Sequence, residues 1–374
     1  MKKYLGILCV LCIWAAGTAK GISERVLLEG AVSVQAKEPD REESKEEEKT
    51  EFSEVFQIQA EGIDYLSVEG IRVPQGSVLA MIGKDSKSSF WKKVREGAEQ
   101  AVADLNTALD YTGDARLKLI YDAPEKEDVA EQIDIIDQML DKNPDVLSIG
   151  FADVNSGRTQ MEMAEANGIP VLAVDSGVEN ALIRNSSKTD NYKAGAEAAR
   201  RLCESVGKAG KVALLVHNSQ TESGIEREKG FVEELERHYP GMELVHVAYR
   251  EQDERSVDEI VAAVLMEHPD LNAYFGTNET VTKELVDALA MQEEKAMGVW
   301  AAGFDASARL IEAVEKGRLA GIMAQNPYGM GYAAAVSAFR TIAGMENAAE
   351  INTGYHWISV ENLEEEKSQM LIYK

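Results

Sequence analysis

The sequence is poor in cysteine, histidine and basic residues, and each shortage excludes a class of protein. Three cysteines occur in 374 residues, and two of them, Cys9 and Cys12, lie in a short apolar run at the N-terminus. If that run is removed, Cys203 remains alone, so no internal disulfide can form. The five histidines show no His-x-x-x-His spacing, so we expect no structural zinc. We also expect no cofactor.

Basic residues are outnumbered by acidic ones, 39 to 65, which gives a net charge of −26. Nucleic-acid backbones and anionic lipid surfaces attract basic patches, so this balance argues against both as partners. The acidity itself is typical of a highly soluble protein. Beyond the N-terminus no run of 18 apolar residues occurs, so we expect no later membrane span.

The first 55 residues read as a leader and a tether. A basic start, about 13 apolar residues and a small-residue site predict an export signal or membrane anchor over residues 1–19. Leucines precede Cys9 and Cys12, which argues against lipidation because a modified cysteine normally follows a small residue. Residues 20–55 are predicted to be an acidic flexible linker, although their Glu/Lys spacing could also support a transient helix. We therefore expect an exported, extracytoplasmic protein, either tethered to the outer face of the cytoplasmic membrane or periplasmic.

From residue 77 onward, strand and helix patterns alternate. The predicted strands are 77–83, 117–121, 146–151, 170–175, 211–216, 244–248, 273–277, 299–304 and 319–324. Repeated βα units predict parallel sheets with helices on both faces. So many strands suit two doubly wound lobes joined by a hinge better than one sheet. The predicted divisions are an extended arm (56–76), an N-terminal lobe (77–189 plus 326–354) and a C-terminal lobe (190–325 plus 355–374).

Polar side chains recur just after the predicted strands, at the edge where open α/β sheets bind ligands. Planar carboxylate, amide and guanidinium groups can each pair with two neighbouring hydroxyls. The loop 84–91 adds a lysine, several hydroxyls and two adjacent aromatics, a set that suits a polyhydroxylated ligand. Alone, each residue has a bland alternative, such as a helix cap, a core aromatic or a surface charge. The candidate ligand-binding residues are Lys84, Phe90, Trp91, Asp153, Asp175, Arg227, Tyr249, Gln252, Asn278, Asp305 and Gln325.

Seven segments, in order, give the sequence a family resemblance over about residues 77–374. They are Lys84–Ala98, Gly168–Gly177, Thr189–Gly195, Glu226–Phe231, Gly276–Glu279, Gly303–Asp305 and Ala324–Gln325. Together they resemble the ribose-type (type I) periplasmic sugar-binding proteins, the substrate-binding components of bacterial ABC transporters.

The resemblance implies a monomeric binding protein whose lobes close on a sugar. Phe90 and Trp91 would sandwich the sugar ring with a partner from the other lobe, while polar groups bind its hydroxyls. Lys84 stands where many members carry a small polar residue. Gln252 falls where some members place a stacking aromatic, for which Tyr249 could substitute. These departures leave the ligand's identity open.

Other readings of the chain are weaker. A ligand-responsive transcription regulator can share this fold, but no basic helix-turn-helix precedes the core. An enzyme would need a catalytic motif, and neither a Gly-x-Ser-x-Gly elbow nor a phosphate loop is present. Asp175 and Asp305 could imitate a glycosidase pair, but hydroxyl binding suits them better in this fold. Within the binding-protein reading, the partner is a membrane permease or, alternatively, a sensor kinase or chemoreceptor.

Overall fold

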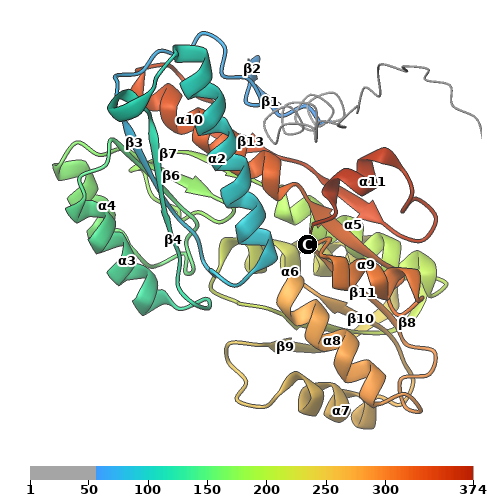
Figure 1. The fold of residues 1–374 in the computed structure, drawn as a ribbon. Helices are drawn as coiled ribbons and strands as arrows, with labels where there is room; N and C mark the ends of the chain where they lie inside the picture. Colours follow the sequence, from blue (N-terminus) through green and yellow to red (C-terminus); the bar gives the residue numbers. More distant parts are fainter. Residues whose placement is uncertain (1–55, 374) are drawn as a thin grey trace, which may run out of the picture. The chain divides into compact units, whose positions relative to one another are not determined.

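The structure, a computed structural model, describes residues 56–373. The predicted export segment and acidic linker lie outside the described residues. Two six-stranded sheets organise the rest, each with its own set of helices (Figure 1).

The first sheet has the strand order β13-β7-β6-β5-β3-β4, and all of its strands are parallel. Its strands are β3 (Val78–Ile82), β4 (Lys118–Asp122), β5 (Val146–Ile149), β6 (Val171–Val174), β7 (Ile183–Lys188) and β13 (Glu350–Asn352). The second sheet has the order β14-β12-β11-β10-β8-β9, parallel except for β14. Its strands are β8 (Ala209–Val216), β9 (Gly241–Tyr249), β10 (Leu271–Gly276), β11 (Trp300–Phe304), β12 (Gly321–Gln325) and β14 (Tyr355–Ile358).

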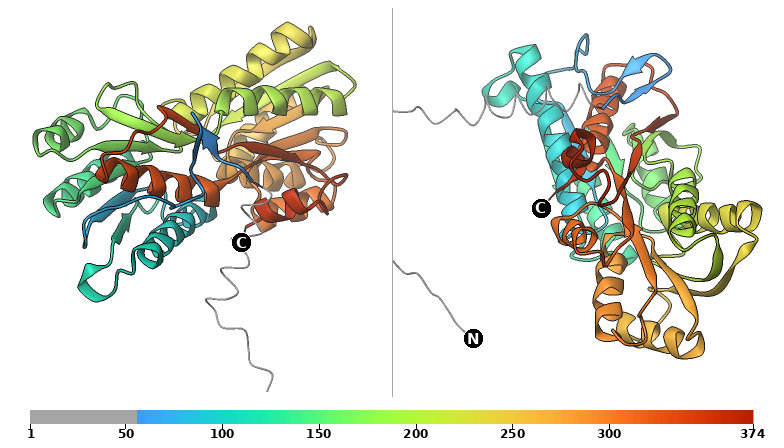
Figure 2. Two further views of the ribbon diagram at one scale, coloured as in Figure 1. Left: turned by 90° about the horizontal axis from the view of Figure 1, so that it is seen from above. Right: turned by 90° about the vertical axis from the view of Figure 1, so that its right-hand side faces the viewer.

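Helices cover both faces of each sheet (Figure 2). Those of the first lobe are α2 (Ser89–Leu109), α3 (Val129–Asp141), α4 (Arg158–Ala166) and α10 (Pro327–Ile342). Those of the second are α5 (Asn191–Ser205), α6 (Glu222–His238), α7 (Val257–Glu267), α8 (Glu279–Met291), α9 (Ala308–Glu315) and α11 (Glu366–Leu371). The prediction of an α/β protein with two doubly wound lobes is confirmed.

Most of these helices begin at a polar residue that follows a strand. The side chains of Asp190, Thr221 and Asn278 accept a backbone N–H from the first turn of α5, α6 and α8. Ser256 and Glu259 form a full capping box on α7. Such caps pair N–H groups that the helix cannot satisfy itself, so the strand-to-helix junctions are fixed by the sequence.

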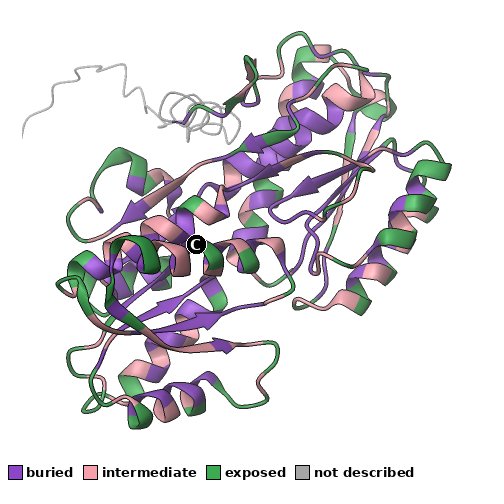
Figure 3. Cartoon of the chain, turned by 180° about the vertical axis from the view of Figure 1, so that it is seen from behind, coloured by how far each residue is buried: buried purple, intermediate pink, exposed green. Residues whose placement is uncertain are grey.

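The central strands are buried along their whole length (Figure 3). The strand Val171–Val174 is apolar on both faces because helices cover both. Cys203 on α5 is 1% exposed, and burial raises the pKa of its thiol to about 12. Cys203 thus packs as a small apolar side chain in the core of the second lobe.

The chain passes between the two sheets three times. It leaves β7 for α5 at residues 189–190, returns from β12 to α10 at residue 326, and leaves β13 for β14 at residues 353–354. Three short connecting segments therefore join the lobes, which is the arrangement of a hinge.

Each lobe contains a pair of helices that pack with backbone in contact. A Cβ added to Gly331 on α10 would lie 1.8 Å from the carbonyl oxygen of Val94 on α2, and one on Gly97 would lie 2.0 Å from that of Tyr328. The second lobe has the same kind of close helix contact at glycine. A Cβ on Gly195 of α5 would lie 2.2 Å from the Arg227 carbonyl oxygen on α6. Glycine is required at these contacts because any side chain would separate the helices.

Residues 56–76 form an arm on the first lobe. They contain the small hairpin β1 (Gln59–Ala60) and β2 (Ile63–Asp64), which lies beside β13 (Figure 1). Tyr65 is fully buried and its hydroxyl accepts the N–H of Ala348 at 2.8 Å. The arm thus adds apolar surface to the first lobe's core. Among residues 56–373, no helix combines the length and apolarity needed to cross a bilayer.

Candidate functional site

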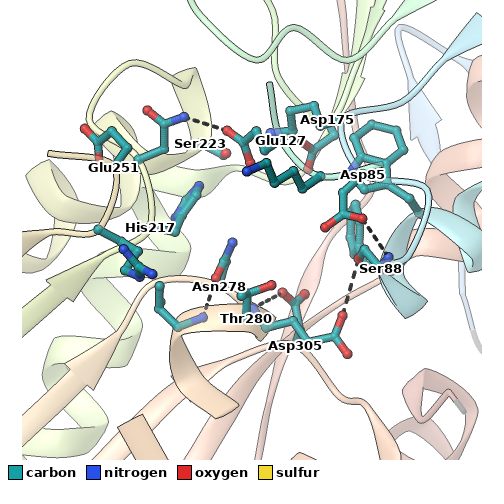
Figure 4. A pocket seen from close by; sticks show the side chains of 18 of the residues that line it. Asp85, Ser88, Glu127, Asp175, His217, Ser223, Glu251, Asn278, Thr280 and Asp305 are labelled. Atoms are coloured by element: carbon teal, nitrogen blue, oxygen red, sulfur yellow. Dashed lines mark hydrogen bonds and ion pairs between the residues drawn. The ribbon is translucent and has the colours of Figure 1, made fainter. Parts of the chain in front are cut away.

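A cavity of about 420 Å³ lies between the carboxyl ends of the two sheets, lined by both lobes (Figure 4). Its volume falls in the range of small-molecule sites. Eight of the eleven predicted binding residues line it: Lys84, Phe90, Trp91, Asp175, Arg227, Asn278, Asp305 and Gln325.

The other three predicted residues do not line this cavity. Asp153 accepts the N–H of Asn155 at 2.6 Å in a turn after β5. The hydroxyl of Tyr249 donates to Glu228 at 2.7 Å, which holds the ring at the outer end of β9. Gln252 is exposed and donates to the Ser219 hydroxyl at 2.7 Å. These three residues do not contact the cavity, and their roles in ligand binding remain predictions.

The aromatic wall of the cavity comes from the start of α2. The rings of Phe90 and Trp91 meet edge to face, with centroids 5.7 Å apart and an interplanar angle of 87°. Trp91 fits only because two strand ends carry glycine. A Cβ on Gly83 would lie 2.9 Å from the indole, and one on Gly150 would lie 2.3 Å from it.

Two aspartates occupy matching places in the two lobes. Asp175 follows β6 and Asp305 follows β11, and both have a left-handed backbone, with φ of 65° and 77°. This conformation is strained for residues other than glycine and tends to persist at functional sites. Both side chains are nearly fully buried, at 4% and 2% exposure.

Lys84 and Asp175 form a buried ion pair within the first lobe. The Lys84 Nζ lies 2.7 Å from Asp175 Oδ2 and donates to the Ser176 hydroxyl at 3.0 Å. A buried lysine is costly unless it is paired, so the lysine and the aspartate are fixed together. The lysine at position 84, where the resemblance implies a small polar residue in many members, therefore serves as the ion-pair partner of Asp175.

Arg227 is held by the second lobe. Its Nε donates to Asn191 Oδ1 at 2.9 Å, its Nη1 donates to the Thr277 carbonyl at 2.8 Å, and its guanidinium lies 4.0 Å from the Phe304 ring centre. Among residues 56–373, no carboxylate lies within ion-pair distance of it, and no protein acceptor pairs with Nη2. The guanidinium is thus oriented by the protein, with donor capacity left for a ligand.

Asp305 lies at the centre of a hydrogen-bond chain. Its Oδ2 accepts the N–H of Glu279 at 2.9 Å and its Oδ1 accepts from Gln325 Nε2 at 2.8 Å. Gln325 in turn accepts from the Thr189 hydroxyl at 2.9 Å. Burial raises the pKa of Asp305 to about 6, although Arg227 opposes the rise.

Replacing Asp305 with asparagine is expected to stabilise the ligand-free protein at neutral pH. Asparagine can keep both hydrogen bonds if the Gln325 amide turns over, because the Thr189 hydroxyl can also accept. The rise from 3.8 to about 6 makes ionisation cost up to about 3 kcal/mol at pH values well above 6.

The sign of this effect sets its pH dependence. The folded pKa exceeds the ordinary one, so the penalty is absent below about pH 4, grows between about pH 4 and 6, and is complete above that range. Melting curves of wild type and Asp305→Asn should therefore differ by a few degrees at pH 7.5 and by about half as much at pH 5. A variant less stable than wild type by the same margin at both values would contradict this account.

Several lining residues were not predicted from the sequence. They are Asp85, Ser88, Lys126, Glu127, Asp128, His217, Asn218, Ser223, Arg250, Glu251, Glu279, Thr280, Val281 and Glu284. Asn218 and Thr280 follow strands and carry the same signal as the predicted residues. Glu127 and Glu251 lie in charged loops that resemble ordinary exposed surface.

His217 is the cavity's buried imidazole. Its Nδ1 lies 2.8 Å from the Thr277 hydroxyl and its Nε2 lies 3.3 Å from that of Thr221. Burial, together with the charges of Arg227 and Lys84, lowers the pKa of His217 well below its ordinary value. Figure 4 shows it across the cavity from Asp85 and Ser88. It therefore offers a flat, neutral surface from the second lobe.

The lobes touch on opposite sides of the cavity. Ser88 and Ser89 of the first lobe donate to the Glu279 carboxylate of the second. Asn218 Nδ2 of the second lobe donates to Glu127 Oε1 of the first at 2.6 Å. These pairs place polar groups at the rim, where a bound ligand would be enclosed.

Comparison with known proteins decides the family. Residues 79–346, more than two thirds of the chain, match the family described as "Periplasmic binding protein domain". The chain belongs to the periplasmic binding protein family. The resemblance predicted from the sequence is therefore confirmed, as is the prediction of a binding protein rather than an enzyme.

Individual relatives of this periplasmic binding protein are distant. The ribose import binding protein RbsB of Bacillus subtilis is 24% identical over 209 residues, 56% of this chain and 66% of the relative, just under two thirds of its length. The D-allose-binding periplasmic protein of Escherichia coli is 24% identical over 262 residues, 67% of this chain and 80% of the relative. A carbohydrate transporter solute-binding protein from Agrobacterium radiobacter, solved with D-arabinose, superposes with a TM-score of 0.71 at 23% identity, covering 79% of this chain and 98% of that one.

Proposed function

We propose that the protein captures a small hydroxylated ligand, a monosaccharide or a related compound, in the cavity between its lobes. The observation that carries this proposal is the cavity's lining. One wall is aromatic, from Phe90 and Trp91, and the rest presents fixed polar groups from the strand ends of both sheets. Aromatic faces cover the C–H side of a sugar ring while polar groups pair with its hydroxyls. The sugar-binding names of the relatives support the same ligand class.

We further propose that the ligand-bound protein acts outside the cytoplasmic membrane and delivers its ligand to a membrane ABC permease. The names of the relatives, an import binding protein and a periplasmic protein, support this role. Closure about the three crossing segments would bring groups from both lobes onto the ligand. A permease can then distinguish the loaded protein from the empty one.

A screen of the purified full chain against monosaccharides and sugar alcohols tests ligand capture. Free ligand at a thousand times its dissociation constant stabilises the folded state by about 4 kcal/mol, so the melting temperature should rise by several degrees. Because Trp91 lines the cavity, the ligand should also change the tryptophan fluorescence. No shift and no fluorescence change across the panel would contradict the proposal.

Matched tryptophan variants locate the fluorescence signal. Trp91→Phe keeps an aromatic wall but should lose most of the ligand-dependent change. Trp300→Phe is the control, since Trp300 is 48% exposed at the start of β11 and does not line the cavity. Loss of the signal in the control and not in Trp91→Phe would place the ligand elsewhere.

A further inference from the structure

The walls of the cavity carry an excess of negative charge. Eight of the lining side chains are acidic and four are basic, a formal excess of four negative charges. His217 does not reduce this excess, because burial keeps its imidazole neutral. A neutral sugar needs no such excess, since hydroxyls both donate and accept hydrogen bonds.

The basic side chains do not offset the acidic ones evenly. Lys84 is committed to Asp175 at 2.7 Å, and Arg250 faces Glu284 at 3.5 Å. In the described part of the chain, no lysine or arginine nitrogen lies within 4.0 Å of the carboxylates of Glu127, Glu251 or Asp305. Burying a charge without a partner is costly, so the buried Asp305 and the partly buried Glu127 favour a cationic occupant. Glu251 is exposed and accepts hydrogen bonds from Ser219 and Gln252, so it adds negative charge at the surface only.

Glu127 is the best placed of the three. It comes from the loop between β4 and α3 in the first lobe, and Asn218 of the second lobe donates to its Oε1 at 2.6 Å. Its Oε2 has no protein donor among residues 56–373. Burial raises the pKa of Glu127, while Lys84 and the bond from Asn218 lower it. The carboxylate is thus oriented across the cleft yet incompletely neutralised.

A metal ion does not account for this charge. Across residues 56–373, no group of three or more histidine, cysteine, aspartate or glutamate side chains is placed to hold one. The carboxylates are spread around the cavity, with Glu127 and Glu251 on its walls apart from Asp305 (Figure 4). Such an arrangement fits an organic cation that reaches across the site.

We propose that the ligand carries a protonated amino group next to its hydroxyls, as in an amino sugar or amino polyol, and that Glu127 binds that ammonium group. The inference rests on the proposed function and narrows its ligand class. Lys84, Arg227 and the aromatic wall would hold the hydroxylated part. Anionic ligands such as sugar acids and sugar phosphates would be repelled by the same walls.

Matched pairs of sugars test whether a positive charge on the ligand strengthens binding. Calorimetric titration of the full chain with D-glucosamine against D-glucose, and D-galactosamine against D-galactose, compares ligands that differ by one amine. The amine of at least one pair should bind ten-fold or more tightly than its neutral twin. N-acetyl-D-glucosamine, which has no charge, should bind no better than the neutral sugar.

Two matched variants test whether Glu127 binds the ammonium group. Glu127→Gln should weaken binding of the amine ten-fold or more and change binding of the neutral twin less than three-fold. Glu125→Gln is the control, because Glu125 lies in the same loop with its side chain 69% exposed and paired with Lys87.

The outcomes separate the two proposals. Neutral sugars that bind as well as or better than their amines would overturn this inference and leave the proposed function standing. Equal losses of both ligands in Glu127→Gln would overturn the role of Glu127. Binding of neither class would contradict the inference and the proposed function together.

Discussion

Arg227→Met is expected to abolish ligand binding while the protein stays folded. Arg227 is 2% exposed, and its guanidinium is oriented by Asn191 and the Thr277 carbonyl, with donor capacity left for the ligand. Hydrogen bonds from a charged donor contribute about 1.5–3 kcal/mol each. Losing a buried one leaves ligand and protein groups unpaired, so affinity should fall at least about 100-fold.

Without ligand, the same substitution should cost only moderate stability, because Asn191 Oδ1 and the Thr277 carbonyl lose their donor while the buried charge disappears. Burial lowers the pKa of Arg227, although Asp305 and Asp175 oppose that effect. The charge is therefore held at a desolvation cost, and methionine of similar length removes it. Calorimetric titration and melting curves of Arg227→Met measure both effects.

Arg237→Met is the matched control, since Arg237 lies on the same helix with its side chain 63% exposed. It should bind ligand like wild type. Wild-type affinity in Arg227→Met, or an equal loss in both variants, would contradict the assigned role of Arg227.

Gly331→Ala is expected to destabilise the first lobe strongly. The added Cβ would lie 1.8 Å from the backbone carbonyl of Val94, and a backbone atom cannot move aside as a side chain can. Alanine gains about 1 kcal/mol of helix propensity over glycine, but separating α2 from α10 outweighs that gain. We expect a net loss of about 2 kcal/mol or more, seen as a melting temperature lower by several degrees.

Gly230→Ala tests the same device in the second lobe, where the added Cβ would lie 2.0 Å from the Tyr192 carbonyl. Ala130→Val, on the exposed face of α3, is the control for added bulk on a helix. Unchanged melting temperatures in both glycine variants would show that the helix pairs do not need this close approach.

The sequence could predict the sheets and the residues at their edges because both depend on local patterns. Apolar runs such as residues 170–175 alternate with amphipathic stretches, and the chain order of βα units implies parallel pairing. Asp175 and Asp305 directly follow their strands. Open α/β sheets bind ligands at the carboxyl ends of their strands, so both residues are expected at the cavity. The exact lobe boundaries stay predictions. The binding roles that were assigned from the family resemblance also stay predictions.

The rest of the cavity depends on how the two lobes meet, which no local pattern encodes. Glu127 reads as one acid in a charged loop, and only its contact with Asn218 of the other lobe distinguishes it from Glu125. Tyr249 ends β9 and Gln252 lies three residues later, close to where binding residues follow the other strands. The loop after β9 does reach the cavity through Arg250 and Glu251. The side chains of Tyr249 and Gln252, on either side of that pair, bond to Glu228 and Ser219 instead.

A crystal structure of the full chain, grown with the ligand that gives the largest thermal shift, tests the central claim most directly. The account predicts that ligand occupies the cavity between the lobes, with one face against Trp91 and polar atoms within hydrogen-bond distance of Asp175, Arg227 and Asp305. A ligand bound elsewhere on the molecule, with this cavity free of it, would contradict the account.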